Sequence, residues 1–318
     1  MTHTQITYLV FGIILILAVA LDLGLLSKKS KNLSIHQAMW QTLFWVSLGL
    51  GFGAFMWYEE GKTTALEYIS AYLMEWSLSI DNIFVFVLIF SFFKVREAYI
   101  PRALLIGILM AILFRVVFIT VGVELVNRFH WLLYIFGIFL VYTGIKMFTT
   151  NQDEEFSPAD SKVYRFLKRY LPITMSDGNG RYFFRYHGRP VYTSLFVVVV
   201  MLATTDIVFA LDSIPAVMGI SRNVLVIYTS NIFAVLGLRS LFFLLRGAVS
   251  KFDYLQQGIS IVLVFIGLKM LGEGLISTVV NKQQQVVISL VVIVTCISGS
   301  IFYSMYHNKK GLPKEVRD

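Results

Sequence analysis

Nine apolar runs, each long enough to cross a lipid bilayer, recur along this chain of 318 residues and exclude a water-soluble fold. A bilayer core needs about 20 apolar residues in one helix. Only 14% of the residues are charged, against about 25% in soluble domains. The sequence therefore predicts an all-α polytopic membrane protein with about nine transmembrane helices. The runs occupy residues 8–26, 38–58, 66–93, 102–122, 130–148, 191–217, 223–245, 256–276 and 285–306.

Positive charge lies mostly on one side of these runs. The connections between the runs alternate between the two sides of the membrane. Together with the adjoining helix ends, those on one side hold 20 Lys and Arg residues and those on the other side hold 4. Because cytoplasmic loops carry the excess of positive charge, we expect the N-terminus outside and the C-terminus in the cytoplasm. The net charge of +8 therefore belongs to loops near anionic lipid headgroups, and we expect no nucleic acid as a partner.

Part of the chain repeats itself in sequence. Residues 130–148 align without gaps on residues 253–271 with 7 identities in 19 positions, and upstream Arg115 corresponds to Arg239. Three spans separate each helix from its counterpart, so the two copies must cross the membrane in opposite directions. This pattern predicts an inverted repeat of helices 3–5 and 6–8, an architecture of secondary transporters that bind substrate near the midplane.

The repeat divides the chain into five parts. These are two N-terminal helices (1–61), a first repeat (62–148), a cytoplasmic segment (149–190), a second repeat (191–280) and a last helix with a cytoplasmic tail (281–318). The cytoplasmic segment contains a basic amphipathic stretch, SKVYRFLKRYL, and a hairpin that turns at His187 and Gly188. We expect the basic stretch to rest against anionic lipid headgroups, with a dedicated protein partner as the alternative.

Two pairs of acids with a spacing of six lie well inside the apolar runs: Glu75 with Asp81, and Asp206 with Asp212. An Asp at the centre of a membrane helix costs about 2.5 to 3.5 kcal/mol, so these acids indicate a functional site. On an unbroken helix a spacing of six rotates two side chains by about 600° and separates them by about 9 Å. Neither pair can converge unless its helix opens.

Both acidic stretches offer a place to open. Pro215 removes a helical hydrogen bond and frees backbone carbonyls beside Asp212. Around Asp81, the polar side chains of Ser77, Ser79 and Asn82 compete for backbone hydrogen bonds. We therefore expect broken helices at both acidic motifs, which membranes tolerate only where the irregular backbone lines a protected cavity.

Charge accounting favours a bound cation. Arg115 and Arg239 could each neutralise one acid in a purely structural core, which is the alternative. Two acids then remain unmatched, and their charge equals that of one divalent cation. Asn231 is read as a further ligand or as a helix–helix hydrogen-bonding residue. The candidate metal ligands are Glu75, Asp81, Asp206, Asp212, Asn82, Ser213 and Asp22, the last lining the pathway or only solvated at the interface.

Ligand chemistry narrows the cation. The chain has one cysteine, Cys296, and five histidines that all lie in predicted loops or at helix ends. The buried site therefore offers carboxylate, amide, hydroxyl and carbonyl oxygens. Such ligands suit Mn²⁺, Mg²⁺ or Ca²⁺ and argue against Cu(I) or a Zn²⁺ site of Cys and His. No organic cofactor is expected.

The motifs EWSLSIDNIFVF, TDIVFALDSIPAV and LGLRSLFFLL resemble the TerC family, in particular its Alx-type bacterial members. The resemblance covers nearly the whole chain and is strongest over residues 62–273. It implies a multi-pass protein of the bacterial inner membrane that exports manganese, with the two acid pairs as functional residues. Where the family pattern often has Glu, three residues before Asp206, this chain has Ala203.

The sequence thus favours a secondary transporter that exports Mn²⁺ from the cytoplasm, with protons as a candidate counter-ion. A transporter of Ca²⁺ or of a monovalent cation is the near alternative. A scaffold or modulator in stress or redox homeostasis, acting through residues 149–190, is an alternative of another class. We do not expect an enzyme, because no Ser-His or paired His arrangement accompanies the acids.

Overall fold

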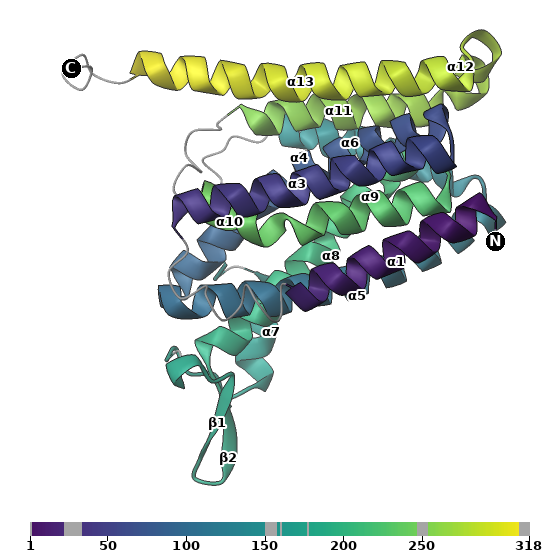
Figure 1. Cartoon of the computed structure of the whole chain (residues 1–318). Coiled ribbons are helices and arrows are strands. Elements are labelled where there is room, and N and C mark those ends of the chain that lie inside the picture. The colour runs from purple at the N-terminus through teal and green to yellow at the C-terminus, as the bar shows by residue number, and fades with distance from the viewer. Residues whose placement is uncertain are drawn as a thin grey trace.

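The computed structural model describes residues 2–21, 34–149, 158–159, 161–176, 178–246 and 254–311, except the side chains of Asp81 and of residues 307–311. The described chain is mostly helical, and its long helices form a single bundle (Figure 1). Its elements are α1 (His3–Leu21), α3 (Ile35–Glu59), α4 (Lys62–Phe92), a 3₁₀ turn (Glu97–Tyr99), α5 (Ile100–Arg128), α6 (Leu132–Thr149), α7 (Lys162–Tyr170), a 3₁₀ turn (Gly178–Gly180), β1 (Phe183–Tyr186), β2 (Arg189–Tyr192), α8 (Ser194–Ile220), α9 (Val224–Leu236), α10 (Leu238–Leu245), α11 (Leu255–Leu271), α12 (Glu273–Val279) and α13 (Lys282–Gly311).

Seven of the described helices are long and apolar enough to cross a membrane, and two bent pairs bring this number to nine. Helices α9 and α10 meet at 42° beside Gly237, and α11 and α12 meet at 81° beside Gly272. Each span lies where an apolar run predicts one. The prediction of an all-α polytopic membrane protein is confirmed.

The acidic helices α4 and α8 run without a break through both motifs, so the expectation of broken helices there is wrong. Pro215 lies inside α8, where the helix continues despite the lost hydrogen bond. In α4 the Ser77 hydroxyl donates to the Leu73 carbonyl oxygen one turn earlier at 2.8 Å, so it does not compete with the helix. The bends occur instead at glycines, beside Gly237 and Gly272.

Helices α6 and α11, which carry the aligned stretches of the repeat, pack through their smallest residues. A Cβ atom added to Gly144 would lie 2.8 Å from the carbonyl oxygen of Ser260, and one added to Gly267 would lie 2.7 Å from that of Gly137. The two helices are therefore antiparallel, and their backbones approach closely, as small residues allow in membranes. In the alignment Ser260 corresponds to Gly137, and Gly267 corresponds to Gly144. The contact between Gly144 and Ser260 is therefore the counterpart of the contact between Gly267 and Gly137. The inverted repeat and the division into parts stay predictions.

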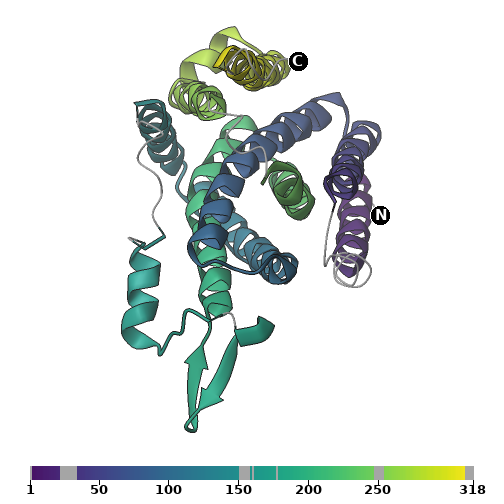
Figure 2. The same cartoon turned by 90° about the vertical axis from the view of Figure 1, so that its left-hand side faces the viewer.

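A short arm leaves the bundle between α6 and α8. It consists of α7 and the antiparallel hairpin β1–β2, which projects beyond the helices (Figures 1 and 2). Phe183 pairs with Tyr192 and Tyr186 pairs with Arg189. His187 and Gly188 form the turn with φ of 48° and 78°, which confirms the predicted hairpin.

The close approach of α6 and α11 makes Gly144 intolerant of a larger residue. Gly144→Ala should lower the free energy of unfolding by about 1 to 3 kcal/mol, because the new methyl group meets a backbone oxygen that cannot move aside. Gly299→Ala in α13 is the control, since no atom lies within 4 Å of its added Cβ. Thermal unfolding of the purified protein in detergent checks this, and equal melting temperatures for both variants would contradict the packing.

Candidate functional site

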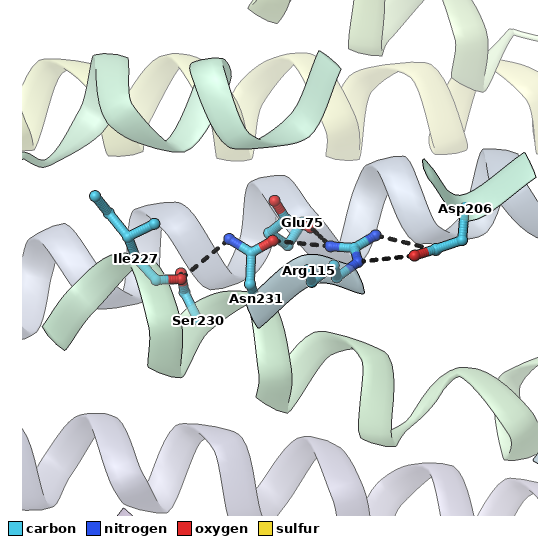
Figure 3. A network of polar contacts seen from close by, with 6 residues as sticks. All are labelled: Glu75, Arg115, Asp206, Ile227, Ser230 and Asn231. Atoms are coloured by element: carbon cyan, nitrogen blue, oxygen red, sulfur yellow. Dashed lines mark hydrogen bonds and ion pairs between the residues drawn. The ribbon is translucent and has the colours of Figure 1, made fainter. Parts of the chain in front are cut away.

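A buried arginine joins four helices at the centre of the bundle. Arg115 of α5 contacts Glu75 of α4, Asp206 of α8 and Asn231 of α9 (Figure 3). Its Nη1 lies 2.6 Å from Glu75 Oε2 and 2.8 Å from Asn231 Oδ1. Its Nε and Nη2 lie 3.3 and 3.4 Å from the two oxygens of Asp206. The planar guanidinium therefore binds Asp206 with two donors and Glu75 with a third.

The surroundings of this network exclude water. Glu75, Arg115, Asp206 and Asn231 are all at most 1% exposed. Asn231 is fixed at both ends of its amide, because its Nδ2 donates to the Ile227 carbonyl oxygen at 3.1 Å while its Oδ1 accepts from Arg115. Its role is therefore a helix–helix hydrogen bond, the more conservative of the two readings of the sequence.

The network carries more negative than positive charge. Two carboxylates, Glu75 and Asp206, share the single guanidinium of Arg115. The second oxygen of Glu75, Oε1, is buried and has no hydrogen-bond partner among the described residues. An unsatisfied buried oxygen on an ionised group is costly. With both acids ionised, this closed network therefore keeps one negative charge in excess.

A second polar group lies around a cavity of about 290 Å³ between α4, α6, α8 and α11. Asp212 is half-buried there, and Asn82 and Ser213 are buried. The Ser213 hydroxyl has no hydrogen-bond partner among the described residues. Oxygen-bearing side chains of three types thus face one space. The lining residues are Leu78, Asn82, Thr143, Lys146, Met147, Phe209, Asp212, Ser213, Gln256 and Leu263.

The predicted ligands therefore fall into two groups. Glu75 and Asp206 meet at Arg115, whereas Asp212, Asn82 and Ser213 meet at the cavity. The expected pocket shared by both acid pairs does not form among the described side chains, which contain no group of three His, Cys, Asp or Glu able to hold a metal. The reason is helix continuity, since a spacing of six on an intact helix turns the second acid about 120° away from the first.

Two predicted ligands lie outside what the structure describes. These are Asp22 and the side chain of Asp81. For all seven candidates the role as metal ligand stays a prediction. Thr143 and Gln256 were not predicted from the sequence, although both line the Asp212 cavity. Neither is charged, so no cost of membrane insertion marks it, and only the packing of α6 and α11 against α8 reveals it.

Comparison with known proteins yields one family and several close relatives. The family model described as "Integral membrane protein TerC family" matches residues 60–312. A Myxococcus xanthus protein, "Uncharacterized membrane protein STKORF319", is 44% identical over 251 residues, 79% of this chain and 78% of its own. An Escherichia coli K12 protein, "Putative membrane-bound redox modulator Alx", is 36% identical over 309 residues, 94% of this chain and 95% of its own. No solved structure matches the chain.

Removing the central cation should destabilise the bundle. Arg115→Met leaves Glu75 and Asp206 buried without a counter-charge, a change that typically costs about 3 to 5 kcal/mol. Adding Glu75→Gln and Asp206→Asn to this variant should restore most of the loss, because none of the three positions then carries a buried charge. Arg128→Met is the control, since that side chain is 73% exposed.

Thermal unfolding in detergent measures all of these variants. A triple variant that unfolds as readily as Arg115→Met would show that shape, and not charge, makes Arg115 necessary.

Proposed function

The chain belongs to the TerC family of integral membrane proteins, and from this premise we propose that it is a secondary transporter that exports Mn²⁺ from the cytoplasm. The observation that carries the proposal is the Asp212 cavity, where one carboxylate, amide oxygens and hydroxyls face a space inside the bundle. Hard cations such as Mn²⁺ and Ca²⁺ prefer this set of oxygens. Manganese is chosen among them because the resemblance of the motifs to the family implies it.

The position of the cavity suits loading from the cytoplasm. Lys146 and Met147 line it from the last turn of α6, and Gln256 lines it from the first turn of α11. These helix ends lead into connections on the side that holds most Lys and Arg, which is cytoplasmic by the positive-inside rule. A cation would therefore reach Asp212 from inside the cell, in a bacterial inner membrane with the N-terminus outside.

The network at Arg115 gives Glu75 and Asp206 a role in the proposal. Asp206 lies about 9 Å along α8 from Asp212, so a cation at Asp212 acts on the same helix that holds the network. In the proposal, Arg115 neutralises Glu75 and Asp206 while no cation is close. When a cation moves along the path toward these acids, the cation takes over part of this neutralisation. Movement of one repeat against the other would then expose the cation outside. Protons released or taken up by the carboxylates are a candidate for the coupling.

The name of the relatives suggests a redox role, which this chain could not perform by disulfide exchange within itself. It contains one cysteine, Cys296, half-buried in α13, and an internal disulfide needs two. Transport of a metal that influences redox balance would account for a modulating effect without any thiol chemistry. We therefore propose a transporter rather than an enzyme.

Anionic lipid headgroups are the proposed partner of the arm. Lys162, Lys168 and Arg169 of α7 are exposed, and Phe166 and Tyr170 beside them are 61% and 63% exposed. Basic residues next to exposed aromatic ones are typical of segments that lie in a membrane interface. The hairpin also combines exposed aromatic and basic residues, because Phe183 and Tyr186 are exposed beside Arg185 and Arg189.

Manganese export should depend on Asp212. Cells that lack the gene should accumulate manganese, the wild-type chain should restore efflux, and Asp212→Asn should lose it, because the amide cannot balance a cation. Glu97→Gln, an exposed acid outside the cavity, is the control. Cellular manganese measured by mass spectrometry decides the outcome, and full efflux by Asp212→Asn would refute the site.

The arm should respond to lipid charge. Phosphatidylglycerol should raise the melting temperature of the wild-type protein more than phosphatidylcholine does. This difference should shrink when Lys162, Lys168 and Arg169 are all changed to Gln, since each basic residue near an anionic surface contributes about 1 kcal/mol. An unchanged response of the triple variant would contradict the lipid assignment, and Arg128→Gln serves as the control.

A further inference from the structure

A fifth acid lies buried in the bundle and takes no part in the two groups described above. Glu67 of α4 is 1% exposed and precedes Glu75 by eight residues, about 12 Å along the helix axis. The Ser221 hydroxyl donates to its Oε2, and Lys282 Nζ lies 3.1 Å from its Oε1. A buried acid in a membrane helix indicates a function unless its charge is permanently matched.

The counter-charge of Glu67 differs from that of Glu75. Lys282 is the first residue of α13, and its side chain is 74% exposed. Its ammonium can therefore leave Glu67 for water without being desolvated itself, but the carboxylate that it leaves is buried and must then be matched by another cation. Arg115, in contrast, is 1% exposed and held by three side chains. Glu67 thus has an exchangeable cation, whereas Glu75 has a fixed one.

Both partners of Glu67 line a second cavity, of about 380 Å³. Two further cations line it. Arg222 pairs with Glu273, which also lines the cavity, and Lys269 Nζ lies 3.1 Å from the Ser289 hydroxyl and interacts electrostatically with Glu273 and Glu67. The cavity also contains the neutral amides of Asn281 and Gln285. The hydroxyl of Ser221 and the ammonium of Lys282 therefore connect the buried carboxylate of Glu67 with an open polar space.

The repeat relates this cavity to the Asp212 cavity. Three residues that line the cavity near Glu67 correspond in the alignment to three residues that line the Asp212 cavity. The corresponding pairs are Leu133 with Gln256, Lys269 with Lys146, and Met270 with Met147. The antiparallel pair α6–α11 therefore offers an equivalent surface at each of its two ends. A transport path that opens alternately on the two sides needs such a pair of cavities.

We propose that Glu67 is a second cation ligand, on the exit side of the path, and that Lys282 is its tethered competitor. The inference rests on the proposed function, since it assigns the second end of the same path. The ligand is a hard divalent cation bound through Glu67 and Ser221. Lys282 swings out when the cation arrives and returns to Glu67 when it leaves, which opposes rebinding from outside.

Binding of Mn²⁺ to the purified full-length protein tests this, measured from the loss of the electron paramagnetic resonance signal of aqueous Mn²⁺. All variants carry Asp212→Asn, so that the first site does not contribute. Adding Lys282→Gln should tighten binding of one Mn²⁺ per chain at least about tenfold, because a competing charge a few ångströms away is removed. Adding Glu67→Gln as well should abolish this binding, and Arg128→Gln in place of Lys282→Gln should change nothing.

Unchanged binding after Lys282→Gln, or binding that survives Glu67→Gln, would overturn the second site. Melting temperatures check that each variant is folded. The double change of Glu67→Gln and Lys282→Gln removes both charges of the ion pair, so it leaves no unpaired charge at this position. Efflux separates this inference from the function it rests on. Loss of efflux in Asp212→Asn together with wild-type efflux in Glu67→Gln overturns the second site alone, whereas efflux by Asp212→Asn overturns the proposed function.

Discussion

The guanidinium of Arg115 determines how this bundle can hold acids inside a membrane. It contacts Glu75 and Asp206 from two different helices, and Asn231 from a third, with all four side chains shielded from water. In such surroundings an unmatched carboxylate would cost several kcal/mol, so the helices can close only around the cation. The same contact leaves one negative charge over, because two acids share one arginine. Stability and an attraction for further cations therefore arise from one interaction.

Continuity of α4 and α8 is the second constraint. Since α8 does not break, Asp206 and Asp212 face different directions, and the described polar residues divide between a closed ion network and an open cavity. This division separates two tasks. The network fixes how four helices are arranged, while the cavity leaves oxygens available to a ligand. A protein that must bind a cation and release it benefits from keeping these tasks on different residues of one helix.

Much of this architecture could be predicted from the sequence, because the cost of placing residues in lipid is set by each helix alone. Apolar length located the seven long helices and the two bent pairs of the described chain, and the rarity of intramembrane charge marked Glu75, Asp206 and Asp212. Which side chains meet depends instead on how each helix is rotated against its neighbours. The sequence therefore could not predict that Arg115 serves two acids, nor that Thr143 and Gln256 face Asp212. Pro215 predicted a break that the structure does not have, because a single lost hydrogen bond does not break α8.

The central claim is that a hard divalent cation occupies the cavity beside Asp212. Crystals of the full-length protein grown with Mn²⁺, with anomalous scattering recorded at the manganese absorption edge, test it most directly. The account predicts an anomalous peak within bonding distance of the Asp212 carboxylate, between α4 and α8. Anomalous density confined to the protein surface, with Asp212 bonded only to protein groups or water, would contradict it.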